Sequence, residues 1–136
     1  MTSRYLLALG LLVLVTASGW PNDGSKNWDY TELQKAPEKD KAKKNPMRDD
    51  PDAPVAGAIL FENHCEECHG ANAEGTRKGP SLRFKEVQDA APGAIFWILT
   101  NGVVRKKMPV WSKLPEQQRW QLVSYVKSLS GANSKK

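Results

Sequence analysis

The chain has 136 residues, two cysteines and a formal net charge of +5, and 40% of its residues are hydrophobic. This length can hold one modest domain and excludes a large multidomain enzyme. Two cysteines can form at most one disulfide, which excludes a small secreted fold built on a disulfide framework.

Residues 1–17 are predicted to be a secretory signal peptide. Arg4 precedes an apolar run over residues 5–15, and small residues follow it, which is the order typical of an export signal. The run is well short of the about 20 residues that cross a bilayer as a helix. Small residues before Ser18 suit a cleavage site, with an uncleaved signal anchor as the alternative. We therefore expect a periplasmic or otherwise extracytoplasmic protein, attached to the inner membrane only if the signal stays uncleaved.

Residues 18–53 are predicted to form a charged, flexible arm. They contain four prolines and no apolar period, and from residue 20 onward seven basic side chains nearly balance eight acidic ones. Such a composition buries too little apolar surface to offset the entropy of ordering. Balanced charge favours a solvated tether over a nucleic-acid patch, so no nucleic-acid partner is expected. The aromatic residues Trp20, Trp28 and Tyr30 are the exception, and they either pack back on the domain or meet a partner.

A regular apolar pattern begins at Pro54, a residue suited to the first turn of a helix. The first helix is predicted over residues 54–69, and its apolar positions include Val55, Ile59 and Phe61. The following segment, 70–91, is rich in Gly and polar residues, which predicts a loop with at most a short helix at 83–87. A second helix is expected over residues 93–100, opened by Pro92.

The last helix is predicted to start at Pro115, after a second loop, and to extend to about Ser130. Its buried stripe is expected to consist of Leu122, Val123, Val126 and Leu129. No stretch of the chain alternates with period two. The sequence therefore predicts one all-α domain over residues 54–130 with long loops, followed by a C-terminal tail over 131–136.

Cys65-Glu66-Glu67-Cys68-His69 is a C-x-x-C-H motif, the attachment signature of c-type haem. On one helical turn, positions i, i+3 and i+4 lie on the same side. Two thiols can then reach the two haem vinyl groups while the imidazole of His69 meets the iron. We therefore expect one haem c, covalently attached through Cys65 and Cys68.

Three other interpretations of the motif fit less well. A structural zinc site needs about four ligands, and its two ligand pairs usually lie about 12 residues apart. Here all the candidate ligands lie within six positions: His64, Cys65, Cys68 and His69. A thioredoxin-type dithiol needs a βαβ setting, which the pattern does not predict. A structural disulfide is possible but leaves the adjacent histidine without a role.

Met108 is expected to supply the second axial ligand, opposite His69. The exported chain has two methionines, Met47 in the arm and Met108 in the second loop. Pro109 follows Met108 and restricts the backbone beside it. His64 directly precedes the motif and cannot easily reach the far face, so we interpret it as a surface histidine. A loop methionine that only fills a gap in the core is the alternative.

Further short motifs accompany C-x-x-C-H over residues 54–130. In chain order they are Gly57 and Phe61, Gly70 directly after His69, Gly79-Pro80-Ser81-Leu82, Asn101-Gly102, Met108-Pro109 and Tyr125. In this combination the domain resembles a class I cytochrome c, a mono-haem protein with His/Met ligation. The resemblance implies a small all-α cytochrome c fold, with helices packed around one covalently bound haem.

The resemblance also implies roles for particular residues. The Pro80 carbonyl would accept a hydrogen bond from the iron-bound imidazole of His69. Trp97 and Trp111 would wall the haem or donate an indole N–H to a propionate, with core packing as the alternative. The first and last helices would cross closely at three residues, Gly57, Phe61 and Tyr125.

A haem with both axial positions filled leaves no coordination site for a substrate, so the expected function is one-electron transfer between redox partners and not enzyme catalysis. One alternative is a haem-based enzyme or gas sensor in which Met108 is displaced. Another is a bound electron-transfer subunit of a larger dehydrogenase.

A basic stretch, Arg105-Lys106-Lys107, directly precedes Met108. Residues 54–136 carry 12 basic and 7 acidic side chains, so the domain itself is positively charged. The three cations are expected to rim the haem edge and steer a redox partner with an acidic docking surface. The alternative is that they only solvate the loop.

Overall fold

The computed structural model describes residues 28–130. The predicted signal peptide, the arm before Trp28 and the C-terminal tail lie outside the described residues. Within this range the chain is helical and forms no strand, and its one isolated antiparallel bridge joins Val103 and Met108. The predicted all-α class is confirmed. None of the helices in this range combines the length and apolar character needed to cross a membrane.

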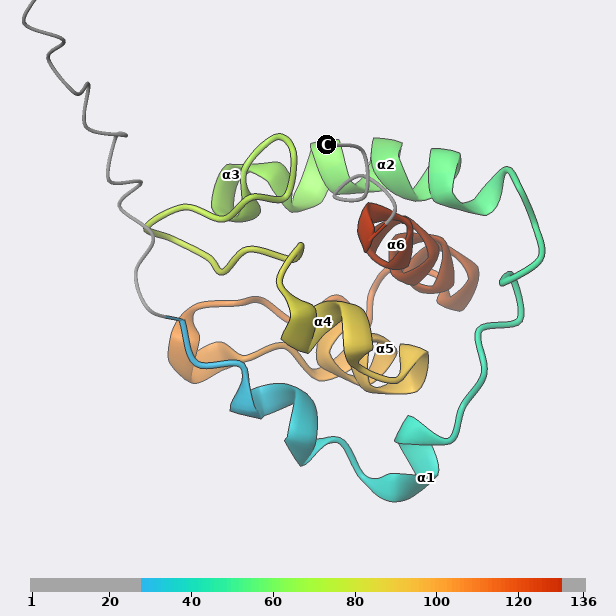
Figure 1. Ribbon diagram of the computed structural model, residues 1–136, viewed down its shortest axis with the longest axis horizontal. Helices are drawn as coiled ribbons and strands as arrows, with labels where there is room; N and C mark the ends of the chain where they lie inside the picture. Colours follow the sequence, from blue (N-terminus) through green and yellow to red (C-terminus); the bar gives the residue numbers. More distant parts are fainter. Residues whose placement is uncertain (1–27, 131–136) are drawn as a thin grey trace, which may run out of the picture.

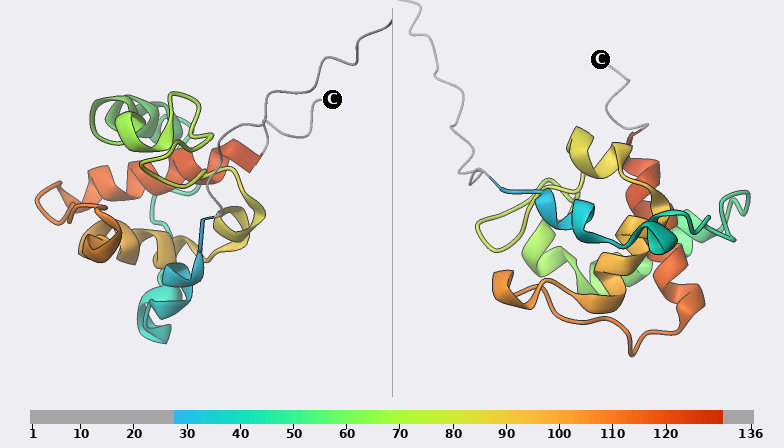
Figure 2. Two further views of the ribbon diagram at one scale, coloured as in Figure 1. Left: turned by 90° about the vertical axis from the view of Figure 1, so that its left-hand side faces the viewer. Right: turned by 90° about the horizontal axis from the view of Figure 1, so that it is seen from below.

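Three helices form the centre of the molecule: α2 (Ala53–His64), α5 (Pro92–Asn101) and α6 (Glu116–Ser128). α6 packs against both of the others and lies between them (Figures 1 and 2). Each helix begins with a proline in or just before its first turn, where a missing N–H costs no hydrogen bond. The predicted stripe of the last helix is buried as expected, at Leu122, Val123, Val126 and Leu129.

The crossing of α2 and α6 is close because Gly57 has no side chain. A Cβ atom at Gly57 would lie 2.1 Å from the carbonyl oxygen of Gln121. Beside the crossing, Phe61 is 2% exposed and its ring centroid lies 5.1 Å from that of Tyr125. The three residues implied by the family resemblance therefore meet at this point.

Two of the apolar positions predicted for the first helix face outward. Val55 and Ile59 are 62% and 58% exposed. They lie one turn apart, so they share a face of α2, and that face is not the one that carries Gly57 and Phe61 against α6.

The predicted helix over 54–69 is divided at Cys65. This residue has φ −125° and ψ −30°, which ends α2 and precedes a single further turn, α3 (Glu66–His69). The short helix expected near 83–87 is present as α4 (Lys85–Asp89). A 3-10 turn, η2 (Val104–Lys106), lies in the loop before Met108.

The predicted flexible arm differs from the structure over residues 28–53. This segment contains η1 (Thr31–Lys35) and α1 (Glu38–Lys41), and both pack against α5. In Figure 1 it runs along α5 and then rises to the start of α2. Gly93 of α5 allows the approach, because a Cβ atom there would lie 1.9 Å from the carbonyl oxygen of Asp40.

Further contacts fasten the same segment to α6. The side-chain amide of Asn45 donates a hydrogen bond of 2.8 Å to the hydroxyl of Ser124. Met47 packs against the hydrophobic core, and Ala36 is only 3% exposed. The segment is ordered by individual contacts to distant residues and not by a periodic apolar face, which is why its composition predicted a flexible tether.

Gly57→Ala is expected to lower the free energy of unfolding by about 1–3 kcal/mol, as overpacking of a tight contact does. Denaturant unfolding followed by circular dichroism measures the effect. Val55→Ala in the same helix is the control, since surface substitutions usually change the free energy of unfolding by less than about 0.5 kcal/mol. Equal effects of the two substitutions would contradict a close crossing at Gly57.

Candidate functional site

A cavity of about 450 Å³ opens between the α2–α3 segment, α5 and the two long loops. Its walls are mainly apolar and include Phe61, Leu82, Val87, Ile95, Ile98 and Leu99. The volume lies within the range of about 300–1,000 Å³ that small-molecule sites occupy. Five of the predicted site residues line it together, namely Cys65, Cys68, His69, Pro80 and Met108.

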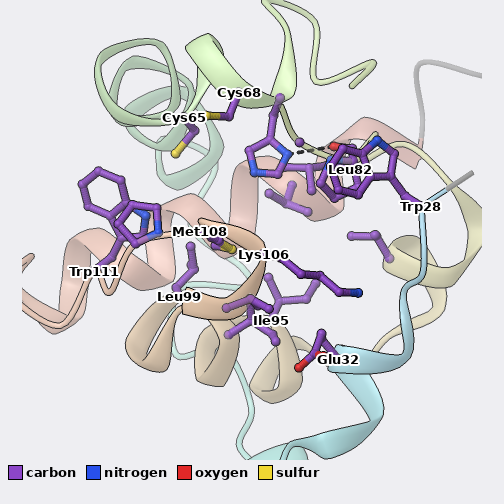
Figure 3. A pocket seen from close by; sticks show the side chains of 18 of the residues that line it. Trp28, Glu32, Cys65, Cys68, Leu82, Ile95, Leu99, Lys106, Met108 and Trp111 are labelled. Carbon is purple, nitrogen blue, oxygen red and sulfur yellow. Dashed lines mark hydrogen bonds between the residues drawn. The ribbon is translucent and has the colours of Figure 1, made fainter. Parts of the chain in front are cut away.

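The two cysteines lie on the wall formed by α2 and α3 (Figure 3). They form no disulfide with each other, and the turn of α3 is closed by a hydrogen bond of 3.0 Å from the His69 N–H to the Cys65 carbonyl. Burial raises the pKa of the Cys65 thiol to about 12, and the neighbouring Cys68 adds to the effect. Before haem attachment, the Cys65 thiol is therefore protonated at neutral pH.

His69 is held by the loop that follows the motif. Its Nδ1 lies 2.7 Å from the Pro80 carbonyl oxygen, and because that oxygen can only accept, Nδ1 is the donor and Nε2 carries the lone pair. Burial lowers the pKa of His69, so the ring is neutral at neutral pH, the form that binds metals. The loop comes this near because Gly79 has no Cβ, which would lie 2.9 Å from the Cys68 carbonyl oxygen.

Met108 lies across the cavity from the two cysteines (Figure 3). Its backbone exchanges two hydrogen bonds with Val103, of 3.0 and 3.2 Å, which close a tight loop after α5. The loop needs a left-handed residue at each end: Gly102 has φ +66° and Lys107 has φ +67°. A Cβ atom on Gly102 would lie 2.7 Å from the carbonyl oxygen of Pro109, so glycine is required there by space as well as by conformation.

This donor set fits a covalently attached haem. Two thiols and a neutral imidazole share one wall, a thioether stands on another, and the remaining walls are mainly apolar, as a largely apolar ring requires. A structural zinc site does not fit, because the described residues contain no group of three or more His, Cys, Asp or Glu side chains placed to hold a metal ion.

Trp97 was predicted to contact the cofactor, and the structure differs. Trp97 does not line the cavity, whereas its α5 neighbours Ile95, Ile98 and Leu99 do. At about 100° of rotation per residue, Trp97 points to the other side of the helix from Ile95. The second predicted tryptophan, Trp111, does line the cavity.

His64 is exposed, as the interpretation of a surface histidine expects. Its ring centroid lies 5.2 Å from that of Trp111, at one end of the cavity.

Sequence reasoning missed the part of the arm that borders the cavity. Five residues of this segment line it: Trp28, Asp29, Tyr30, Glu32 and Leu33. The available signal was the presence of Trp28 and Tyr30 in an otherwise polar stretch, since aromatic residues are scarce in purely solvated segments.

The same segment neutralises part of the predicted basic rim. Glu32 forms an ion pair with Arg105, and the Asp29 carboxylate lies 3.2 Å from the Lys106 ammonium. Hydrogen bonds from Thr31, and then Lys106, lower the pKa of Asp29 to about 2, so it is ionised at neutral pH. Lys107 is exposed and forms no ion pair within residues 28–130.

Three comparisons with known proteins each find a cytochrome c or a subunit of a cytochrome c oxidase. The model of the family described as cytochrome c oxidase, cbb3-type, subunit III matches residues 52–126, more than half of the chain. The cbb3-type cytochrome c oxidase subunit CcoP of Rubrivivax gelatinosus is 35% identical over 86 residues, which cover 61% of this chain and 28% of that protein. The crystal structure of cytochrome c-L from the marine methylotroph Methylophaga aminisulfidivorans superposes with a TM-score of 0.53 at 28% identity, over 61% of this chain and 57% of that one.

Tyr30→Phe is expected to change stability in a pH-dependent way. The hydroxyl donates a hydrogen bond of 2.9 Å to the Ser81 carbonyl, and such a bond contributes about 0.5–1.5 kcal/mol. Burial raises the pKa of Tyr30 to about 12, above the value of about 10 in an unfolded chain. As the pH rises from about 10 toward 12, the unfolded wild type loses this proton first, so the wild type loses stability that the variant keeps.

Denaturant unfolding of the two proteins at several pH values measures the difference. The wild type should be the more stable protein below pH 10, and its advantage should shrink above pH 10. If the difference in the free energy of unfolding between the two proteins stays constant over the whole pH range, the Tyr30 hydroxyl is not buried and hydrogen-bonded as described.

Proposed function

This chain belongs to the family of cbb3-type cytochrome c oxidase subunit III, and we propose that it is a one-electron carrier whose haem iron is held by His69 and Met108. The domain is a cytochrome c electron-transfer domain with covalently bound haem c, and Cys65 and Cys68 stand at the spacing that attaches it. One observation carries the ligand assignment: His69 and Met108, from separate segments, line the same apolar cavity as the two thiols.

When bound, haem c supplies a ferric/ferrous couple. The residues of this chain set the conditions for it. The Pro80 carbonyl holds the His69 ring in one tautomer, and the Met108 thioether favours reduced iron over what a second nitrogen ligand would give. The apolar walls limit the access of water, which also shifts the potential.

If His69 and Met108 both bind the haem iron, the iron would have no open position for a substrate, so outer-sphere transfer is the chemistry that the site would support. A displaceable Met108, as in a gas sensor, is less well supported because two backbone hydrogen bonds to Val103 hold the residue. We place the protein outside the cytoplasm, in the periplasm or at the inner membrane, on the basis of the predicted signal peptide over 1–17.

A second candidate is a subunit that carries electrons within a larger redox complex. The similarity to an oxidase subunit favours it. The chain spans 28% of the length of that relative, so assembly into such a complex remains a proposal. The haem site would do the same chemistry in both cases.

Met108→Ala tests the ligand assignment. Without the thioether, the ferrous protein should bind carbon monoxide readily and its reduction potential should fall. Absorption spectra with and without carbon monoxide, together with a redox titration, measure both effects. Met47→Ala is the matched control, because Met47 packs against the core without lining the cavity. If the wild type binds carbon monoxide as readily as Met108→Ala, the assignment is wrong.

We propose that Lys107 contributes most of the electrostatic attraction that the predicted basic stretch, Arg105-Lys106-Lys107, exerts on a redox partner. Arg105 and Lys106 form ion pairs with Glu32 and Asp29 of the same chain, so their fields are partly cancelled. A redox partner with an acidic docking surface would still meet net positive charge there, but less than the sequence alone suggests.

Lys107→Gln should slow oxidation of the ferrous protein by ferricyanide, an anionic oxidant, by about two- to fivefold at low salt, and the difference should vanish as salt increases. Stopped-flow absorption measures the rate. Lys39→Gln removes the same charge from an exposed site outside the cavity and is the control. Equal rates for the two variants would contradict steering by Lys107.

A further inference from the structure

Residues 28–33, which we term the clasp, run along the edge of the cofactor cavity. All of them except Thr31 line the cavity. The clasp lies between the loop that holds His69 and the loop that holds Met108, and its contacts divide between the two.

Two aromatic side chains of the clasp bind the His69-side loop. The indole N–H of Trp28 donates a hydrogen bond of 3.3 Å to the Thr76 carbonyl. The Tyr30 hydroxyl donates one of 2.9 Å to the carbonyl of Ser81, the residue directly after Pro80, which accepts from His69. Tyr30 also packs edge-to-face on Phe84, with ring centroids 5.8 Å apart.

Two acidic side chains of the clasp bind the Met108-side loop. Lys106 donates a hydrogen bond of 3.0 Å to the Asp29 carbonyl and lies 3.2 Å from its carboxylate. The Asp29 carboxylate is held in place by the backbone N–H and hydroxyl of Thr31, at 2.8 and 2.9 Å. Glu32 pairs with Arg105, and the Glu32 side chain is only 14% exposed, so solvent screens this contact less than an ordinary surface pair.

The clasp therefore connects the His69-side loop with the Met108-side loop. Trp28 and Tyr30 fasten one loop, Asp29 and Glu32 fasten the other, and Leu33 anchors the clasp by packing against the core. The Met108-side contacts fall on the two residues of η2 nearest to Met108 in sequence, Arg105 and Lys106. In Figure 3, Glu32 and Lys106 lie on the same side of the cavity as Ile95.

We propose that the clasp holds the Met108 loop closed over the cavity by tying it to the His69-side loop, so that Asp29 and Glu32 are positioning residues for the Met108 sulfur. The inference rests on the proposed function, in which Met108 is the iron ligand. Its consequence is kinetic: release of the sulfur requires the loop to open, and opening breaks both ion pairs.

The test uses the full-length holoprotein. Asp29→Asn with Glu32→Gln removes both acidic contacts to the Met108-side loop with little change of shape, and it also removes the pair of Glu32 with Lys35 on the same turn. The matched control, Glu38→Gln with Asp49→Asn, removes two acidic charges from the same 28–52 segment, where the partners are Lys41 and Arg48 and neither acidic residue lines the cavity. The readout is the rate at which the ferrous protein binds carbon monoxide, because binding must wait for Met108 to leave.

The clasp variant should bind carbon monoxide at least about threefold faster than the wild type, since opening of the Met108 loop no longer has to break the two ion pairs. The control should match the wild type within experimental error. Rates equal to those of the control would overturn the proposal. Circular dichroism at the same temperature must show both variants folded, so that faster binding reports loop opening and not global unfolding.

A salt series on the wild type gives a second measurement that needs no variant. Added salt should speed carbon monoxide binding in the wild type and the control but leave the clasp variant unchanged. A salt-independent wild-type rate would overturn the clasp. The ferric absorption band that arises from a methionine sulfur bound to iron separates the two proposals. Its absence from the wild type overturns the Met108 assignment and the clasp with it, whereas its presence with unchanged rates overturns the clasp alone.

Discussion

The close crossing of α2 and α6 at Gly57 determines where the cofactor site lies. A side chain there would overlap the Gln121 carbonyl, so the approach of the two backbones fixes the axis of α2. Cys65 follows the end of α2 directly, and the single turn of α3 carries Cys68 and His69. A shift of this crossing would move all three groups together with respect to α5 and the Met108 loop. The helix contact therefore sets the distance between the two walls of the cavity, although Gly57 itself does not line it.

The two proposed axial residues, His69 and Met108, are held in different ways. His69 depends on side-chain burial and one hydrogen bond to the Pro80 carbonyl, which suits a ring whose orientation must be fixed. Met108 depends on backbone geometry: two hydrogen bonds to Val103 and left-handed conformations at Gly102 and Lys107. A methionine side chain has three rotatable bonds, and its thioether makes no strong hydrogen bond. The protein can therefore direct the Met108 sulfur only through the position of the Met108 backbone. This difference explains why the methionine side needs a shaped loop and why additional contacts to that loop matter.

What the sequence predicted correctly is mostly local. The C-x-x-C-H motif, the helix starts at prolines and the buried stripe of α6 depend on spacings of a few residues, which the sequence displays directly. The resemblance implied Trp97 as a haem-contacting residue, whereas its phase around α5 turns it away from the side that carries Ile95 into the cavity. The order of residues 28–53 was missed because their contacts, such as Asn45 to Ser124 and Trp28 to Thr76, join residues far apart in the chain. No periodic pattern records such pairs, and a Lys/Asp-rich composition predicts a tether even where individual side chains have partners.

Residues 28–53 also reduce the positive charge that the domain can present to a partner. A count from the sequence places Arg105, Lys106 and Lys107 together and assigns them to a partner. In the folded chain, acidic groups from 73 and 77 positions away reach the first two, as Glu32 pairs with Arg105 and Asp29 with Lys106. An internal carboxylate has an advantage over a partner's because it is present at a high effective concentration and pays little further entropy to bind. A partner must therefore either compete with the arm for these cations or use the charge that the arm leaves over. If the clasp holds the Met108 loop as proposed, the same contacts reduce the electrostatic attraction of that loop for other proteins, so the proposed ligand positioning and docking would be coupled through one short segment.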